Sequence, residues 1–177
     1  MSCKYKMTVT TLVVLLNLLF AQQSIAHIMV AQHGTLNIAE DGVYMVLSLP
    51  VSAFSGIDDD NDGKLSQTEF SRHRPAIAKS VLTNVLLIDN NENLSLHGLM
   101  LSPVTPHHSP KSPASQIIVM GRFTLAELKS TLQYKINLFG TTPPEQLLEI
   151  TATKKADGKE QKFTLSAKNP QANILIN

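Results

Sequence analysis

The alternation of apolar and polar side chains predicts that most of this chain is built from short β-strands. Apolar side chains occupy every second position in residues 43–49, which is the two-residue period of a strand. Val46 is apolar on the opposite face, which indicates burial on both sides. Glu40-Asp41-Gly42 is typical of a hairpin turn, so residues 35–38 are predicted to form the preceding strand. Pro50 should end the ladder because it lacks a backbone N–H.

The second half of the chain repeats this pattern between turn signals. Further strands are predicted at residues 85–88, 94–101, 116–123, 131–138, 147–154, 160–166 and 173–176, with a helical turn at 125–128. Asp157-Gly158 is the strongest hairpin signal, whereas the proline-rich residues 102–115 predict an irregular surface loop. About eight short strands favour a mainly β fold, a single β-sandwich-like domain spanning residues 27–177.

Residues 51–82 carry a helical pattern, so the predicted sandwich has a helix–loop–helix insertion after its second strand. Ser52 is a suitable cap for a short entering helix that runs through Ile57. The exit helix should end near Leu82, and Pro75 is expected to kink or restart it near Arg74. The apolar residues that mark its buried face are Leu65, Phe70, Ile77 and Val81.

The loop between these helices, residues 58–69 with the sequence DDDNDGKLSQTE, matches the twelve-residue calcium loop of an EF-hand. Calcium prefers six to eight oxygen ligands, and carboxylates at alternate positions converge because the loop curls around the ion. Lys64 would contribute its backbone carbonyl, Ser66 would bind directly or through water, and Glu69 would supply two oxygens. The ligand positions 1, 3, 5, 7, 9 and 12 hold Asp58, Asp60, Asp62, Lys64, Ser66 and Glu69.

Three other loop positions support the calcium interpretation. Gly63 allows the sharp turn that a side chain would obstruct. Asn61 tolerates the left-handed backbone conformation that such a loop requires, and Asp59 should point away from the ion. The alternative interpretation, an acidic surface turn, gives no reason for the glycine, the serine and the terminal glutamate.

Leu65, at position 8 of the loop, needs a packing partner. In paired EF-hands this residue contacts a second loop, but the sequence holds no second acidic loop. Either the rest of the domain covers Leu65 or another chain does. We favour cover by the domain, because the entering helix is short and is tethered directly to the strand that ends at Leu49.

Residues 34–74, GTLNIAEDGVYMVLSLPVSAFSGIDDDNDGKLSQTEFSRHR, resemble a group of uncharacterised bacterial secreted proteins with one EF-hand. Their layout is also similar to that of the periplasmic domains attached to HupE/UreJ-like hydrogenase/urease accessory membrane proteins. There, a strand pair leads into such a loop, a helix and further β-structure. The resemblance implies calcium binding and export from a bacterial cell. Those relatives continue into several membrane helices and this chain ends at Asn177, so no transport role is expected.

The N-terminus is predicted to be a signal peptide, residues 1–26, which makes the protein periplasmic or secreted. Two lysines precede an apolar run at residues 9–20, and Ser24-Ile25-Ala26 provides a cleavage site. The run is shorter than the roughly 20 residues of a membrane span, and no later stretch is long and apolar enough to cross a membrane. Cleavage would remove both lysines, which shifts the net charge from +1 to −1, and the single cysteine, Cys3, so no disulfide is expected.

Few residues outside the loop at 58–69 indicate a binding or catalytic activity. Near-neutral charge without a basic face argues against nucleic-acid binding. The chain has no nucleophile elbow and no glycine-rich phosphate loop, so it is predicted not to be an enzyme. His27 would become the first residue after cleavage and could chelate copper with its free amine, and His33 lies nearby in the sequence. The other histidines, which show no zinc-site spacing, are His73, His97, His107 and His108.

Two functions therefore remain open. The first is an exported calcium-binding protein, a calcium-stabilised binding or interaction module in which the ion orders the insertion and fixes a surface for an unknown protein partner. The second is a soluble periplasmic accessory protein for transition-metal (copper or nickel) handling through His27 and His33. In the second case calcium would only stabilise the structure.

Overall fold

The computed structural model describes residues 31–105, 109, 112–125 and 131–174, which form ten strands, one α-helix and two short 3₁₀ helices. In chain order these are β1 (His33–Ala39), β2 (Gly42–Pro50), η1 (Val51–Ala53), α2 (Gln67–Asn84), β3 (Val85–Asp89), β4 (Glu92–Leu94), β5 (Leu96–Val104), β6 (Gln116–Thr124), β7 (Leu132–Ile136), η2 (Pro143–Gln146), β8 (Leu147–Lys154), β9 (Glu160–Ser166) and β10 (Gln171–Ile174). The predicted mainly β class is confirmed. The predicted signal peptide lies outside the described residues, as does most of the predicted helical turn at 125–128.

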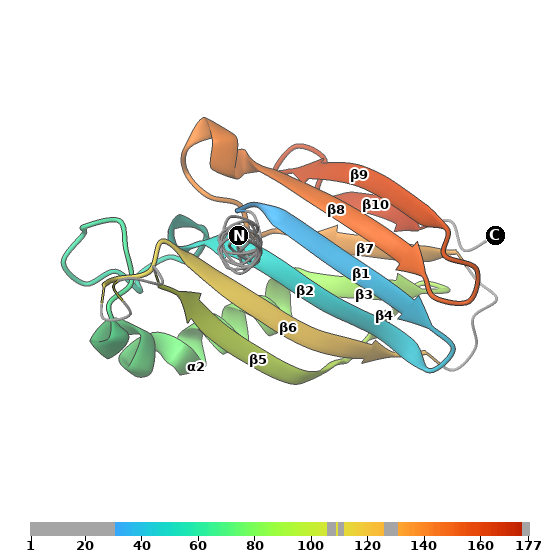
Figure 1. The fold of residues 1–177 in the computed structure, drawn as a ribbon, viewed down its shortest axis with the longest axis horizontal. Coiled ribbons are helices and arrows are strands. Elements are labelled where there is room, and N and C mark those ends of the chain that lie inside the picture. The colour runs from blue at the N-terminus through green and yellow to red at the C-terminus, as the bar shows by residue number, and fades with distance from the viewer. Residues whose placement is uncertain (1–30, 106–108, 110–111, 126–130, 175–177) are drawn as a thin grey trace, which may run out of the picture.

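The strands form two open sheets, and in Figure 1 the larger sheet lies in front of the smaller one. The six-stranded sheet has the order β5-β6-β2-β1-β8-β9, and the four-stranded sheet has the order β10-β7-β3-β4. Neighbouring strands are antiparallel except β1 and β8, which run parallel. The chain crosses from the first sheet to the second between β2 and β3, and the loop and α2 lie in this crossing.

The facing sides of the two sheets share one hydrophobic core. The alternation read from the sequence explains this core, because Leu36, Val43 and Leu47 all point inward and are fully buried. The Tyr134 hydroxyl on β7 reaches the Met45 sulfur on β2 at 3.4 Å, which connects the two sheets through the core. Complete burial raises the pKa of the Tyr134 hydroxyl, so this group stays neutral.

One predicted strand is divided between the two sheets. Residues 94–101 were predicted to form one strand, yet Leu94 ends β4 in the smaller sheet and Leu96 begins β5 in the larger one. The hairpin before it is confirmed, with positive φ angles of 48° at Asn90 and 67° at Asn91. Alternation predicts which residues form strands, but it does not predict which strands become neighbours.

The predicted entering helix is wrong, so the described residues contain no helix–loop–helix pair. Only Val51–Ala53 form a single 3₁₀ turn, and the chain then leaves helical geometry. Ser52 does not cap a helix, because its hydroxyl donates to the Glu145 carboxylate on η2 at 2.9 Å. Gly56 has a φ of 70°, which a right-handed helix does not permit.

The predicted exit helix is present as α2, a continuous helix of 18 residues that packs beside β3 and β5. The predicted restart near Arg74 is wrong, because the helix continues through Pro75. Pro75 is exposed, so water can hydrate the carbonyl group that loses its helical partner there. Phe70, Ile77 and Val81 are buried, as their spacing predicts.

Candidate metal centre

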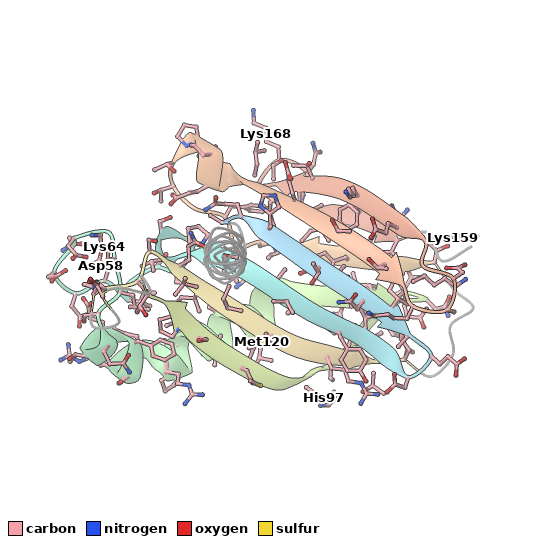
Figure 2. The ribbon with its side chains drawn as sticks, viewed as in Figure 1. Asp58, Lys64, His97, Met120, Lys159 and Lys168 are labelled. Atoms are coloured by element: carbon pink, nitrogen blue, oxygen red, sulfur yellow. The ribbon has the colours of Figure 1, made fainter. Side chains whose placement is uncertain are left out.

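Residues 58–66 form a loop at the end of the molecule and lead directly into α2; Asp58 and Lys64 mark this loop in Figure 2. Two residues of the loop adopt left-handed backbone conformations. These are Asn61, with a φ of 59°, and Gly63, with a φ of 77°. Asparagine and glycine are the residue types that tolerate this region best, so the sequence supplies the residues that the curled backbone requires.

The aspartates of the loop accept hydrogen bonds from its own backbone. The Asp58 carboxylate accepts from the N–H groups of Asp62 at 3.2 Å and Gly63 at 2.8 Å. Asp60 accepts from the same Asp62 N–H at 3.2 Å, and Asp62 accepts from the Lys64 N–H at 2.8 Å. These bonds turn the backbone back on itself, so that residues distant along the loop approach each other.

Glu69 closes the loop through a capping box at the start of α2. The Ser66 hydroxyl accepts from the Glu69 N–H, while Glu69 Oε2 accepts from the Ser66 N–H at 2.7 Å. Glu69 Oε1 accepts from the Asp59 N–H at 2.7 Å, which links the first residues of the loop to the helix. Hydrogen bonds from the Ser66 hydroxyl and from the N–H groups of Ser66 and Asp59 lower the pKa of Glu69 to about 2.

Three of the sequence-predicted ligands come together. One carboxylate oxygen from each of Asp58, Asp60 and Glu69 lies within 4.8 Å of the other two. Two oxygens that both bind one calcium ion at 2.3–2.6 Å can be at most about 5 Å apart, so this grouping is compatible with a shared cation. The Asp62 carboxylate is not part of the group. Lys64 and Ser66 lie in the same loop, where their side chains are not carboxylates and any ligand would be a carbonyl or hydroxyl oxygen.

The electrostatics of Asp60 reflect this crowding of negative charge. The hydrogen bond from the Asp62 N–H lowers its pKa, but desolvation and the nearby charges of Asp62 and Glu69 outweigh that bond and raise the pKa overall. A cation at this position would remove the repulsion. The group can therefore hold a metal ion, and its oxygen donors favour a hard cation.

Asp59 lies outside the carboxylate group, as its position in the loop predicts, but its contacts were not predicted from the sequence. Its carboxylate pairs with two side chains of α2, the Arg72 guanidinium and His73 Nε2, the latter at 2.8 Å. The helical period contains a signal for these contacts. Arg72 and His73 lie three and four residues after Glu69, which places them on the same face of α2, beside the loop.

Leu65 is covered within the chain, so the prediction of cover by the domain is confirmed. Its side chain is only 1% exposed, and the core also takes up Phe54 and Ile57. The Leu65 N–H donates to the Ala114 carbonyl at 2.8 Å, and the Ala114 N–H donates back at 2.9 Å. This two-bond bridge occupies the backbone that a second calcium loop would engage. It joins the loop to the segment just before β6.

The histidines do not form a second metal site among the described residues. His33 uses both ring nitrogens, Nδ1 at 2.7 Å from the Ala31 carbonyl and Nε2 at 2.9 Å from a Glu149 carboxylate oxygen. His97 lies on β5, far from the loop in Figure 2. The three histidines that lie outside the described residues are His27, His107 and His108, so the predicted pair of His27 and His33 stays a prediction.

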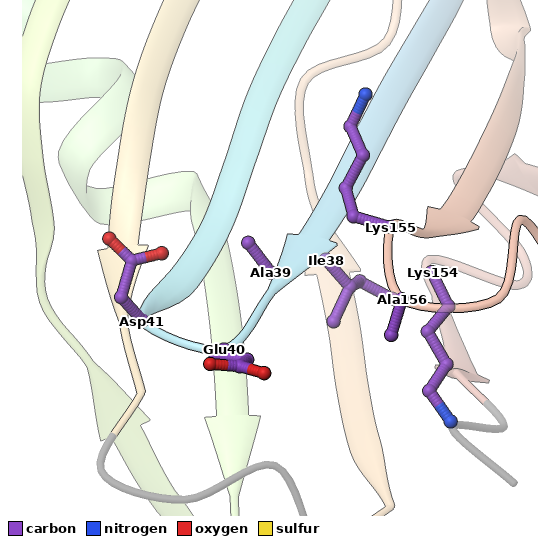
Figure 3. A pocket seen from close by; sticks show the side chains of 7 residues that line it. All are labelled: Ile38, Ala39, Glu40, Asp41, Lys154, Lys155 and Ala156. Atoms are coloured by element: carbon purple, nitrogen blue, oxygen red, sulfur yellow. The ribbon is translucent and has the colours of Figure 1, made fainter.

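A separate pocket of about 420 Å³ lies where the turns after β1 and β8 diverge (Figure 3). Two of its charged groups, Asp41 and Lys154, already interact with other side chains. Asp41 pairs with Arg122 at 2.7 Å and accepts a hydrogen bond from Tyr44 at 2.9 Å, and Lys154 pairs with Asp157 at 3.5 Å. No pattern in the sequence indicates this pocket, and its charged groups do not converge on one point.

The sequence matches no protein-family model, and a comparison with curated proteins gives no match. Among the described residues, no helix combines the length and the apolar character needed to cross a membrane.

Proposed function

We propose that this chain is an exported calcium-binding protein whose loop, residues 58–69, binds one Ca²⁺. The convergence of Asp58, Asp60 and Glu69 carries the proposal, because these residues occupy positions 1, 3 and 12 of the calcium-loop pattern. A helix capping box accounts for the bonds between Glu69 and Ser66, but it gives no reason for this glutamate also to reach the N–H of Asp59 at the start of the loop. We infer that Asp62, the Lys64 carbonyl and Ser66 complete the shell.

The donor set favours calcium over other common ions. Carboxylate, carbonyl and hydroxyl oxygens are hard ligands, whereas copper, nickel and zinc favour imidazole or thiolate ligands. A loop with several carboxylates also suits the larger calcium ion better than magnesium, which demands near-ideal octahedral geometry. Calcium would neutralise the repulsion that raises the pKa of Asp60.

We assign the ion a structural role in a binding module and propose that the protein is not an enzyme. The loop is joined to the sheets at Leu65 and to α2 at Glu69, so a bound ion would stiffen both connections. The resemblance to secreted single-EF-hand proteins and the signal-peptide pattern of residues 1–26 support export. A protein partner would then meet a surface that depends on calcium.

Transition-metal handling through His27 and His33 is the less favoured function. Both ring nitrogens of His33 already have partners in the chain, and a metal would have to displace one of them. Copper and calcium titrations of the same preparation separate the two functions, because the proposed calcium site contains no histidine.

A calorimetric titration of the purified protein with calcium tests the proposal. One site per chain is expected, with a Kd on the order of 10⁻⁵–10⁻³ M, because the loop lacks a partner loop to preorganise it. Asp60→Asn should weaken binding strongly. Asp157→Asn, in the turn between β8 and β9, is the matched control and should leave binding unchanged. Absence of binding heat, or equal affinity of the Asp60→Asn variant, would contradict the proposal.

A further inference from the structure

The first half of the candidate calcium loop has no helix to hold it in place. An EF-hand normally fixes its loop between two helices. Here only η1 precedes the loop, and Gly56 interrupts the backbone between η1 and Asp58. Asp58 and Asp60, which must approach Glu69 to share an ion, therefore need another attachment to α2.

Asp59 provides three contacts of this kind. Its N–H donates to Glu69 Oε1 at 2.7 Å, and its two carboxylate oxygens pair separately with Arg72 Nη1 and with His73 Nε2. All three partners belong to α2. Asp59 also stands between Asp58 and Asp60 in the chain. Fixing its backbone and side chain on the helix therefore restricts both neighbours.

We propose that Asp59, held by Arg72 and His73, is a positioning residue for the calcium site and replaces the missing entering helix. This inference rests on the proposed function of the loop. Asp59 does not bind the ion itself. It acts by keeping the carboxylates of Asp58 and Asp60 within reach of Glu69 before the ion arrives, which lowers the ordering cost of binding.

The positive charge of Arg72 makes this role testable. If Arg72 acts only through its charge, or if it positions Asp59, its removal should change the calcium Kd in opposite directions. A positive charge near a cation site repels the cation, so removing a charge that acts only through its field would tighten calcium binding. Removing an Arg72 that positions Asp59 would weaken calcium binding, despite the relieved repulsion. The direction of the change in Kd therefore distinguishes the two roles.

Calcium titrations of Arg72→Gln and of a matched control, Arg74→Gln, provide the test. Arg74 is exposed on the same helix and has no ion pair with a described residue. Arg72→Gln should raise the Kd about three- to ten-fold, the range expected for a partly exposed ionic network. Arg74→Gln should leave the Kd unchanged or slightly lower. An unchanged or lower Kd for Arg72→Gln would overturn the inference.

The same substitution in an Asp59→Ala variant provides a second test. In Asp59→Ala, Arg72 has nothing left to position, so adding Arg72→Gln should now lower the Kd instead of raising it. The same increase in both backgrounds would contradict the inference. Arg72→Lys keeps the charge but loses the planar guanidinium, and it should weaken binding by a smaller factor; unchanged affinity in this variant would also count against the proposal.

Controls separate this inference from the proposed function. Arg72 is 62% exposed, so its variants should unfold in chelator at nearly the wild-type temperature. If the wild-type protein binds calcium and Arg72→Gln does not weaken binding, only the positioning role fails. If the wild-type protein binds no calcium, the proposed function itself fails.

Discussion

Gly56 and Gly63 have almost the same backbone conformation, with φ angles of 70° and 77°, but only Gly63 lies between proposed ligands. A Cβ atom at either position would meet no atom within 4 Å, so an alanine would be disfavoured by backbone conformation and not by collision. Gly56→Ala and Gly63→Ala should each lower the free energy of unfolding in chelator by about 1–2 kcal/mol.

Only Gly63→Ala should also weaken calcium binding, because it distorts the turn between Asp58 and Glu69. Chemical denaturation in chelator and calorimetric titration of both variants check this pair of expectations. Equal losses of calcium affinity in the two variants would mean that the effect comes from a general destabilisation of the segment and not from the candidate calcium loop.

Glu145 attaches the chain entering the candidate calcium loop to η2, and its ionisation gives a pH prediction. Burial alone would raise its pKa. Hydrogen bonds from the hydroxyls of Thr142 and Ser52 and from the N–H groups of Thr142 and Thr141 outweigh burial and lower the pKa. A carboxyl group whose pKa is lower in the folded state stabilises the protein above its unfolded pKa and loses this effect as the pH falls.

Glu145→Gln should therefore destabilise the protein at neutral pH by about 1 kcal/mol. The difference from the wild-type protein should shrink as the pH falls below the ordinary range of a glutamate side chain. Denaturant unfolding of both proteins at several pH values measures this difference. A difference that stays constant down to acidic pH would show that the charge of Glu145 is not the source of its effect.

The sequence was most informative about the candidate ligands, because their spacing along one loop determines their geometry locally. Asp58, Asp60 and Glu69 converge as the calcium-loop pattern predicts. The contacts of Asp59 were missed, although the positions of Arg72 and His73 after Glu69 contain the necessary information. Ala114 could not be found from the sequence, because its pairing with Leu65 depends on how the distant segment before β6 folds.

Among the elements, Leu65 and its bridge to Ala114 have the most direct consequence for stability. Leu65 is 1% exposed and belongs to the core shared by both sheets. Leu65→Ala should lower the free energy of unfolding by about 2–5 kcal/mol, the usual range for a buried leucine. Leu82→Ala is the control on α2, because Leu82 is 49% exposed and its loss should cost less than about 1 kcal/mol.

Sedimentation of the same variants distinguishes the two predicted kinds of cover for Leu65. If the domain covers this side chain, the wild-type protein and the Leu65→Ala variant should have the same oligomeric state in the presence of calcium. Dimers that form with calcium and disappear in Leu65→Ala would contradict cover by the domain.

Element boundaries were predictable where local chemistry decides them and were wrong where tertiary contacts decide them. The strands β8 and β9 have the bounds that alternation and Asp157-Gly158 predicted. The entering helix failed because Gly56 adopts a left-handed φ and Ser52 binds Glu145. Residues 94–101 divide between two sheets, and this outcome depends on strand neighbours that no local pattern encodes.

At the scale of the whole molecule, the loop and α2 connect the two sheets, because they lie between β2 of the larger sheet and β3 of the smaller one (Figure 1). The mainly β class followed from alternation alone. The order of the strands did not, since the parallel contact of β1 with β8 joins segments that are more than one hundred residues apart. A calcium ion in the loop would therefore act on the connection between the sheets and stabilise the entire fold.

Thermal unfolding in chelator and in saturating calcium tests this claim most directly. A ligand that binds only the folded state adds about 2.7 kcal/mol at one hundred times its Kd, so calcium should raise the melting temperature of the wild-type protein by several degrees. Glu69→Gln should reduce this increase, whereas Glu149→Gln, on β8 away from the loop, should preserve it. Identical melting curves of the wild-type protein with chelator and with saturating calcium would contradict the account.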